Sequence, residues 1–204
     1  MQLIRTPRLV GFRFASPVLC LSSGVLNGGF THARSMVNIF VDKGYAGRDP
    51  AGDIMVVARE HELDDPVVGL MTAVKLEQAA YATSGGVHVL ATAGTSNAEA
   101  AGVTPPWRPP IGTINLLVFI SGRATEAALA GAAITVTEAK VRALLDEGIT
   151  CPETGAPATG TSTDAYAIAC REPGDDLPFL GPVTPVGHTL ARLVYATVRQ
   201  SLRS

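Results

Sequence analysis

The sequence predicts a single α/β domain in which a mixed β-sheet of about six or seven strands is flanked by helices. The chain has 204 residues, the size of one domain, and we find no linker that would divide it, so residues 1–204 are expected to fold together. It is 47% hydrophobic and 17% charged, which supplies apolar material for a substantial core. Short β-favouring runs also alternate with longer segments of helical pattern.

The first half of the chain is expected to contribute most of the strands. Asp49-Pro50 is a helix-start signal, an N-cap followed by proline, and predicts a helix over 50–63. A short helix is predicted over 75–83 because the segment stops at Gly85-Gly86. Short apolar runs predict strands at 7–14, 17–21, 36–41, 67–73 and 87–91.

The second half is expected to supply the main helices. An alanine-rich segment that ends before Gly148 predicts a helix over 125–147, and an amphipathic pattern predicts another over 186–202. Strands are predicted at 112–120 and 165–170. The stretch 104–110 contains four prolines, which exclude a helix or a central strand. It is expected to be a surface excursion, and a role as a lid stays open.

Three polar loops rich in glycine and hydroxyl groups stand out, at 22–29, 92–98 and 158–165. Gly160 in the last loop permits a close approach of the backbone to a ligand, and its neighbours supply donors, acceptors and nucleophiles. Ligands commonly bind at strand ends in α/β folds, so we expect the loops to converge at one edge of the sheet. The alternative is that they are turns whose side chains bond their own backbone.

Composition excludes several classes of function. The formal net charge is −2 and no basic run occurs, so a nucleic-acid partner is not expected. No segment approaches the about 18 consecutive apolar residues of a membrane helix. Three widely spaced cysteines form no disulfide framework, which favours the cytoplasm. The closely spaced histidine ligands of zinc hydrolases do not occur, so no catalytic metal is expected.

Taken together and in order, seven segments of the chain resemble the adenosylcobinamide amidohydrolase family, the CbiZ type. They are Leu21-Ser22-Ser23 with the glycines that follow, Asn38, Met71-Thr72-Ala73, the loop 92–98, Gly112-Thr113-Ile114-Asn115, Glu138-Ala139-Lys140 and the stretch 158–165. Each segment is weakly specific alone, and together they span about residues 20 to 190. Residues 181–188 match the family's C-terminal region only loosely, and the proline-rich stretch is idiosyncratic.

The resemblance implies hydrolysis of the amide that joins the aminopropanol arm to the f side chain of the corrin ring. The products would be adenosylcobyric acid and 1-aminopropan-2-ol, released during corrinoid (cobalamin) salvage. The substrate would be a corrinoid, and no cofactor is implied. Because a corrinoid is larger than a drug-like ligand, we expect a broad open cleft, and a homodimer is one arrangement that would complete it.

An amide is kinetically inert, so a hydrolase needs a nucleophile, a base and donors for the oxyanion. Thr161 or Ser162 is one candidate nucleophile, with Asp164 orienting a base, and Ser22 or Ser23 is the other. Lys140 would act as a base if desolvation lowers its pKa. The catalytic candidates are Ser22, Lys140, Thr161, Asp164 and His188. The candidates for substrate binding are Ser23, Asn27, Gly28, Asn38, Thr95, Ser96, Asn97, Asn115, Glu138, Gly160 and Ser162.

Other interpretations of these residues remain open. Glu138 and Lys140 are two positions apart and face different sides of their helix, where a solvated helix face also explains them. The same loops would suit a non-catalytic module that binds a corrinoid or another large ligand. A phosphate-binding transferase is a third interpretation, although no Walker spacing is present.

Overall fold

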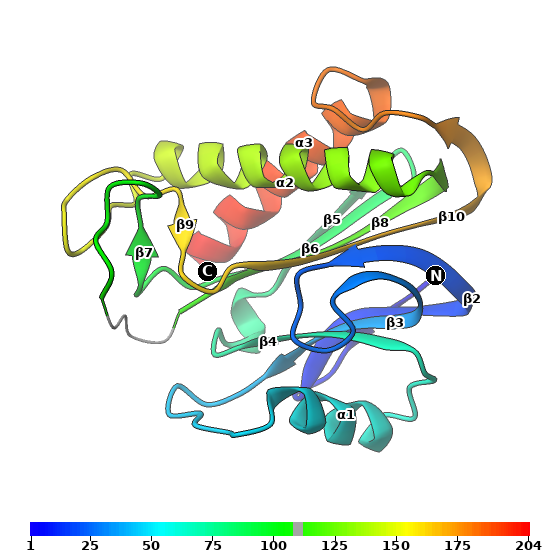
Figure 1. Cartoon of the computed structure of the whole chain (residues 1–204), viewed down its shortest axis with the longest axis horizontal. Coiled ribbons are helices and arrows are strands. Elements are labelled where there is room, and N and C mark those ends of the chain that lie inside the picture. The colour runs from blue at the N-terminus through cyan, green and yellow to red at the C-terminus, as the bar shows by residue number, and fades with distance from the viewer. Residues whose placement is uncertain (108–111) are drawn as a thin grey trace.

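A sheet of eight strands forms the centre of the computed structural model, which describes residues 1–107 and 112–204 (Figure 1). Its strands follow the order β4-β3-β2-β10-β8-β6-β5, and β1 pairs with β2. β3 is parallel to β4 and β10 is parallel to β8, while the other pairs are antiparallel. The prediction of a mixed sheet is therefore confirmed. The strands are β1 (Gln2–Arg5), β2 (Leu9–Ser22), β3 (Gly29–Phe40), β4 (Val67–Thr72), β5 (Ala80–Ser84), β6 (Val87–Ala93), β8 (Ile114–Ala124) and β10 (Ala165–Leu177).

The sheet folds over itself, so that its two halves pack face to face. Phe12 of β2, Met36 of β3 and Leu70 of β4 belong to the same buried cluster as Leu117 of β8 and Ala169 of β10. One half carries α1 (Pro50–Glu60) on its outer face, and the other half carries α2 (Glu126–Asp146) and α3 (Pro185–Arg203) (Figure 1). The result is a layered α/β domain in which the two sheet halves lie between the helices.

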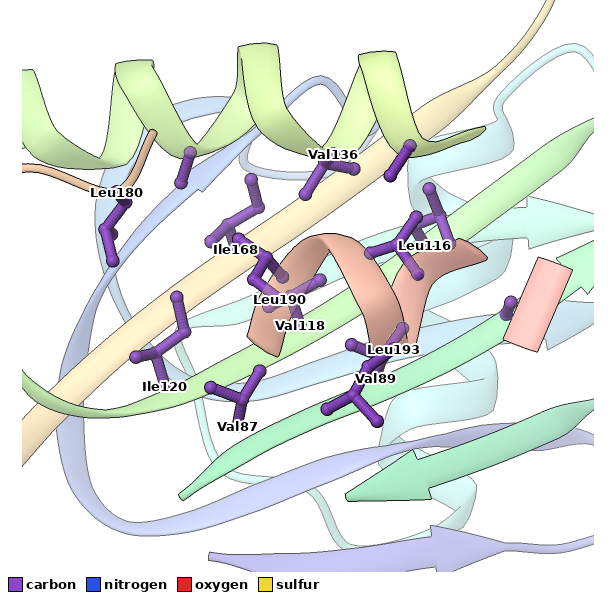
Figure 2. Close-up of a cluster of buried hydrophobic side chains, with 14 of the residues drawn as sticks. Val87, Val89, Leu116, Val118, Ile120, Val136, Ile168, Leu180, Leu190 and Leu193 are labelled. Carbon is purple, nitrogen blue, oxygen red and sulfur yellow. The ribbon is translucent and has the colours of Figure 1, made fainter. Parts of the chain in front are cut away.

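The two-residue period of the strands assigns each side chain to one of these layers. On β8, Leu116, Val118 and Ile120 point to α2 and α3, whereas Leu117 and Phe119 point to the other half of the sheet. Figure 2 shows the first of these layers, where side chains of the strands meet side chains of both helices. Burial of these aliphatic side chains contributes about 1.5–3 kcal/mol each to folding.

All three helices begin at the residues that their capping signals indicate. Asp49, Thr125 and Thr184 each accept a hydrogen bond at the N-terminus of the helix that follows. The predicted helices 50–63, 125–147 and 186–202 therefore correspond to α1, α2 and α3. Within the described residues, no helix is both long and apolar enough to cross a bilayer.

Three of the predicted elements differ from the structure. The strands expected at 7–14 and 17–21 are one strand, β2, whose register with β3 shifts between Arg13 and Val18. The helix expected at 75–83 is a 3₁₀ turn, Leu76–Gln78, followed by β5, which pairs with β6. Gly85 and Gly86 have φ of 54° and 77°, as a two-residue hairpin turn requires, so they connect two strands rather than end a helix. Residues 108–110 of the proline-rich stretch lie outside the described residues.

Candidate active site

A cavity of about 450 Å³ lies where the polar loops meet the ends of the two sheet halves. Ser23 and Gly24 line it from the loop after β2, and Thr163 and Asp164 line it from the loop before β10. Thr72, Thr113 and Asn115 complete a wall that is rich in hydroxyl and amide groups. The sequence expectation that the 22–29 and 158–165 loops converge is confirmed.

A short ribbon brings the 92–98 loop to the same place. β7 (Ala98–Glu99) pairs with β9 (Gly160–Thr161), so these two loops lie side by side (Figure 1). Asn97 is 1% exposed, and its Nδ2 donates to the Ser162 hydroxyl (3.1 Å) and to the Gly112 carbonyl (2.9 Å). Asn97 therefore fixes the ribbon and does not line the cavity.

The Asp164 carboxylate is the centre of the hydrogen-bond network beside the cavity. Its Oδ2 pairs with Nζ of Lys140 at 2.5 Å and accepts the Thr161 N–H at 3.2 Å. Its Oδ1 accepts the Ile114 N–H at 3.0 Å and a bond from the Thr161 hydroxyl. The Lys140 and Asp164 side chains are 12% and 17% exposed, so solvent screens this pair only weakly. The structure therefore brings together three of the five predicted catalytic residues, Lys140, Thr161 and Asp164.

Gly160 lies directly beneath this ion pair. A Cβ at this position would stand 2.6 Å from Asp164 Oδ2 and 2.7 Å from Lys140 Nζ. Only a glycine leaves room for the lysine to reach the carboxylate. The absence of a side chain at Gly160 therefore permits the Lys140–Asp164 ion pair. Substrate binding by Gly160 stays a prediction.

Gly160→Ala is expected to lower the free energy of unfolding by about 1–3 kcal/mol, because the new methyl group displaces Lys140 or Asp164 from its partners. Urea unfolding measures this change. Gly131→Ala is a matched control, since a Cβ at Gly131 on α2 would contact nothing. That variant should gain about 0.5–1 kcal/mol from helix propensity alone. Equal effects of the two substitutions would contradict the close approach at Gly160.

Asn38 and Asn115 form a second network, which joins the two halves of the sheet. Asn115 Nδ2 donates to Asn38 Oδ1 (2.9 Å) and to the Met71 carbonyl (2.8 Å). Asn38 Nδ2 donates to the Thr92 hydroxyl at 2.9 Å, and the Thr113 hydroxyl donates to Asn115 Oδ1 at 2.9 Å. Asn38 is fully buried and Asn115 is 1% exposed. Of the two, only Asn115 lines the cavity, and its amide protons are already donated to protein acceptors.

Neighbouring serines at the end of β2 differ in their surroundings. Ser22 is 4% exposed, and its hydroxyl donates to the Tyr166 carbonyl and accepts the Gly24 N–H, both at 2.9 Å. Ser23 is exposed and lines the cavity, and its oxygen accepts the Tyr166 N–H at 3.1 Å. Among the described residues, the Ser23 hydroxyl accepts this bond and donates to no protein acceptor, so its proton is available to a ligand.

Of the predicted site residues, Ser23, Asn115 and Asp164 line the cavity, and the others do not. Asn27 has a φ of 52° and donates to the Val67 carbonyl, so it stabilises its turn together with Gly28. Glu138 is exposed on α2 at a separate surface hollow, which Leu21 and Tyr166 of the sheet also line. Thr95 accepts the Ala98 N–H through its carbonyl in the turn that also contains Ser96.

His188 is exposed in the first turn of α3, thirteen positions before Ser201. The Ser201 hydroxyl accepts the Ala93 N–H at the end of β6 where the polar loops gather. At 1.5 Å per residue, His188 is about 20 Å further along the helix. The structure therefore does not bring His188 to the other catalytic candidates.

Tyr45 lines the cavity and was not identified from the sequence. It stands in the charged segment between β3 and α1, where no strand or helix pattern draws attention to it. Its hydroxyl donates to Asp53 Oδ2 at 2.6 Å, and this bond raises the pKa of Tyr45 to about 12. The phenol is thus held neutral and oriented by Asp53.

Metal-binding residues do not gather at this cavity. Across 1–107 and 112–204, no group of three or more His, Cys, Asp or Glu side chains is placed to hold a metal ion. The polar atoms of the cavity belong to hydroxyl, amide, carboxylate and backbone groups instead.

The Asp164 carboxylate contacts both the Thr161 hydroxyl and the Lys140 ammonium, so the site places a hydroxyl group beside a proton acceptor. The fold is therefore a layered α/β domain whose loops gather hydroxyl, amide and carboxylate groups at one cavity. Residues 2–204 match the model of the adenosylcobinamide amidohydrolase family, CbiZ. The chain belongs to this family.

Relatives with curated names agree with this assignment. A protein of Halobacterium salinarum named adenosylcobinamide amidohydrolase is 35% identical over 194 residues, which cover 90% of this chain and 80% of the relative. A protein of Methanosarcina mazei with the same name is 30% identical over 186 residues, 87% of this chain and 86% of the relative. An uncharacterised protein of Methanocaldococcus jannaschii is 34% identical over 95 residues, 45% of this chain and 36% of the relative.

Proposed function

We propose that this enzyme hydrolyses the amide between the aminopropanol arm and the corrin f side chain of adenosylcobinamide. The products are adenosylcobyric acid and 1-aminopropan-2-ol, which re-enter corrinoid salvage. Family membership supports the reaction class, and the observation that carries the site is the contact of Asp164 with both Thr161 and Lys140. We propose that Thr161 is the nucleophile, because its hydroxyl already has a proton acceptor.

In the first step, the Thr161 oxygen attacks the amide carbon and its proton passes to the Asp164 carboxylate. Collapse of the tetrahedral intermediate breaks the carbon–nitrogen bond, and the proton on Asp164 passes to the leaving amine. The acyl ester on Thr161 is then hydrolysed by water, which restores the hydroxyl and releases the acid. Lys140 keeps Asp164 in place and is a positioning residue in this scheme.

Ser23 supplies a donor for the oxyanion, since its proton is available and it faces the cavity. Ser23→Ala is expected to lower kcat by about 10²-fold with little change in stability. Ser22→Ala should instead leave kcat unchanged and destabilise the protein by about 1–2 kcal/mol, because it removes two buried bonds. Steady-state kinetics and urea unfolding of both variants separate the two roles. A loss of kcat in the Ser22 variant alone would reverse our assignment.

The function is tested by incubating the purified protein with adenosylcobinamide and following products by mass spectrometry. Adenosylcobyric acid and 1-aminopropan-2-ol should appear together in equal amounts. Binding of the corrinoid without either product would refute the hydrolase and favour the alternative of a non-catalytic corrinoid-binding module.

We also propose a cytoplasmic location. All three cysteines are free and buried, which supports a protein that folds under reducing conditions. The homodimer and the absence of a nucleic-acid partner stay predictions from the sequence.

A further inference from the structure

A second and larger cavity adjoins the one at Asp164. It measures about 1020 Å³ and lies between α1, the segment that follows β3 and the segment that follows β4. It shares Val41, Tyr45 and Ala73 with the smaller cavity, so the two hollows lie next to each other. We call this larger hollow the α1 groove.

The two hollows differ in volume, which suggests that they hold different parts of the substrate. Pockets for drug-sized ligands measure about 300–1,000 Å³, and the cavity at Asp164, at about 450 Å³, falls in the lower part of that range. It can receive one side chain of a corrinoid, such as the amide and its aminopropanol arm. The macrocycle with its remaining side chains needs additional space, and the α1 groove is the hollow that adjoins the reacting amide.

The lining of the α1 groove suits a neutral ligand that is rich in amide groups. Its inner wall is apolar and includes Ile39 and Val57, which are 1% and 3% exposed. Its charged residues comprise three cations and three carboxylates, so their formal charges cancel. They are Arg8, Lys43, Lys75, Asp42, Asp53 and Glu77.

Corrin side chains end in primary amides, and each amide both donates and accepts hydrogen bonds. A rim of mixed charge offers both acceptors and donors to such groups, and its balance of cations and carboxylates gives a polyanionic ligand no net attraction. The apolar wall would cover one part of the ring.

We propose that the α1 groove binds the corrin macrocycle of the substrate while the f side chain enters the cavity at Asp164. This inference rests on the proposed function. Tyr45 stands at the junction of the two hollows and is held there by Asp53, so it would contact the substrate where the side chain leaves the ring.

Filling the α1 groove tests this proposal. Val56 is 52% exposed on α1 and lines only the groove, so a tryptophan there occupies the hollow without disturbing the core. Lys75→Trp fills it from another wall. The matched control is Arg59→Trp, which places the same side chain at an exposed position of α1 outside the groove.

The probe is adenosylcobyric acid, a corrinoid without the aminopropanol arm, and its affinity is measured by equilibrium dialysis. We expect Val56→Trp and Lys75→Trp to weaken binding at least tenfold and to raise KM for adenosylcobinamide, with kcat at saturation preserved. Arg59→Trp should bind the probe as the unchanged protein does. Circular dichroism confirms that each variant retains its helices.

Unchanged affinity in both groove variants would overturn the proposal, and so would an equal loss in Arg59→Trp. The proposed function fails separately, if the unchanged protein releases no 1-aminopropan-2-ol from adenosylcobinamide. In that case, weakened binding of adenosylcobyric acid in the groove variants would still identify the α1 groove as a corrinoid site.

Discussion

Asp164→Asn is expected to lower kcat for adenosylcobinamide by about 10³-fold, because it removes the acceptor for the Thr161 proton while keeping the size of the side chain. The asparagine amide also presents protons where Lys140 and two backbone N–H groups donate to the carboxylate. KM should change little, since the amide still lines the cavity. Steady-state kinetics with product detection by mass spectrometry measure both parameters.

Lys140→Met separates the positioning role of the lysine from the role of the carboxylate. If Lys140 acts through Asp164, the single substitution lowers kcat, but adding it to Asp164→Asn produces no further decrease.

Thr161→Ser retains the hydroxyl and should keep most of the activity, whereas Thr161→Ala should lose it. A folded Asp164→Asn variant with kcat within tenfold of the unchanged protein would contradict the mechanism.

Local signals explain the elements that the sequence predicted well. Thr125 and Gly148 bracket α2, because a threonine N-cap and a glycine after the last turn are local signals for the two ends of a helix. The strand at Val67–Thr72 was predicted from its apolar residues alone. By contrast, residues 80–83 of the predicted helix belong to β5 because β6 pairs with them, and this pairing is not a local property of the segment.

The part of the candidate site that has a local sequence pattern could also be predicted. The hydroxyl loops indicated where polar chemistry would gather, and the family resemblance directed attention to Lys140 and Asp164. The folding of the sheet onto itself has no local signal, so the contact between Asn38 and Asn115, 77 residues apart, could not be foreseen. Tyr45 was missed because its position depends on a hydrogen bond to Asp53 rather than on a pattern.

Asn115→Ala is expected to lower the free energy of unfolding by about 3–5 kcal/mol, because it leaves several buried groups without partners. Asn38 Oδ1 and the Met71 carbonyl each lose a donor, and the Thr113 hydroxyl loses one of its acceptors. The Asn38 side chain is fully buried between the two halves of the sheet, where water cannot easily replace the missing bond. Urea unfolding followed by circular dichroism measures the change.

Asn27→Gly is the matched control for this prediction, since Asn27 is also an asparagine that donates to a backbone carbonyl but is exposed. Glycine removes that bond and relieves the positive φ of 52°, so the net change should stay within about 1 kcal/mol. If Asn115→Ala instead kept full stability and lost only affinity for the corrinoid, Asn115 would be a substrate contact. The size of the unfolding change therefore decides whether this asparagine joins the sheet halves or binds the substrate.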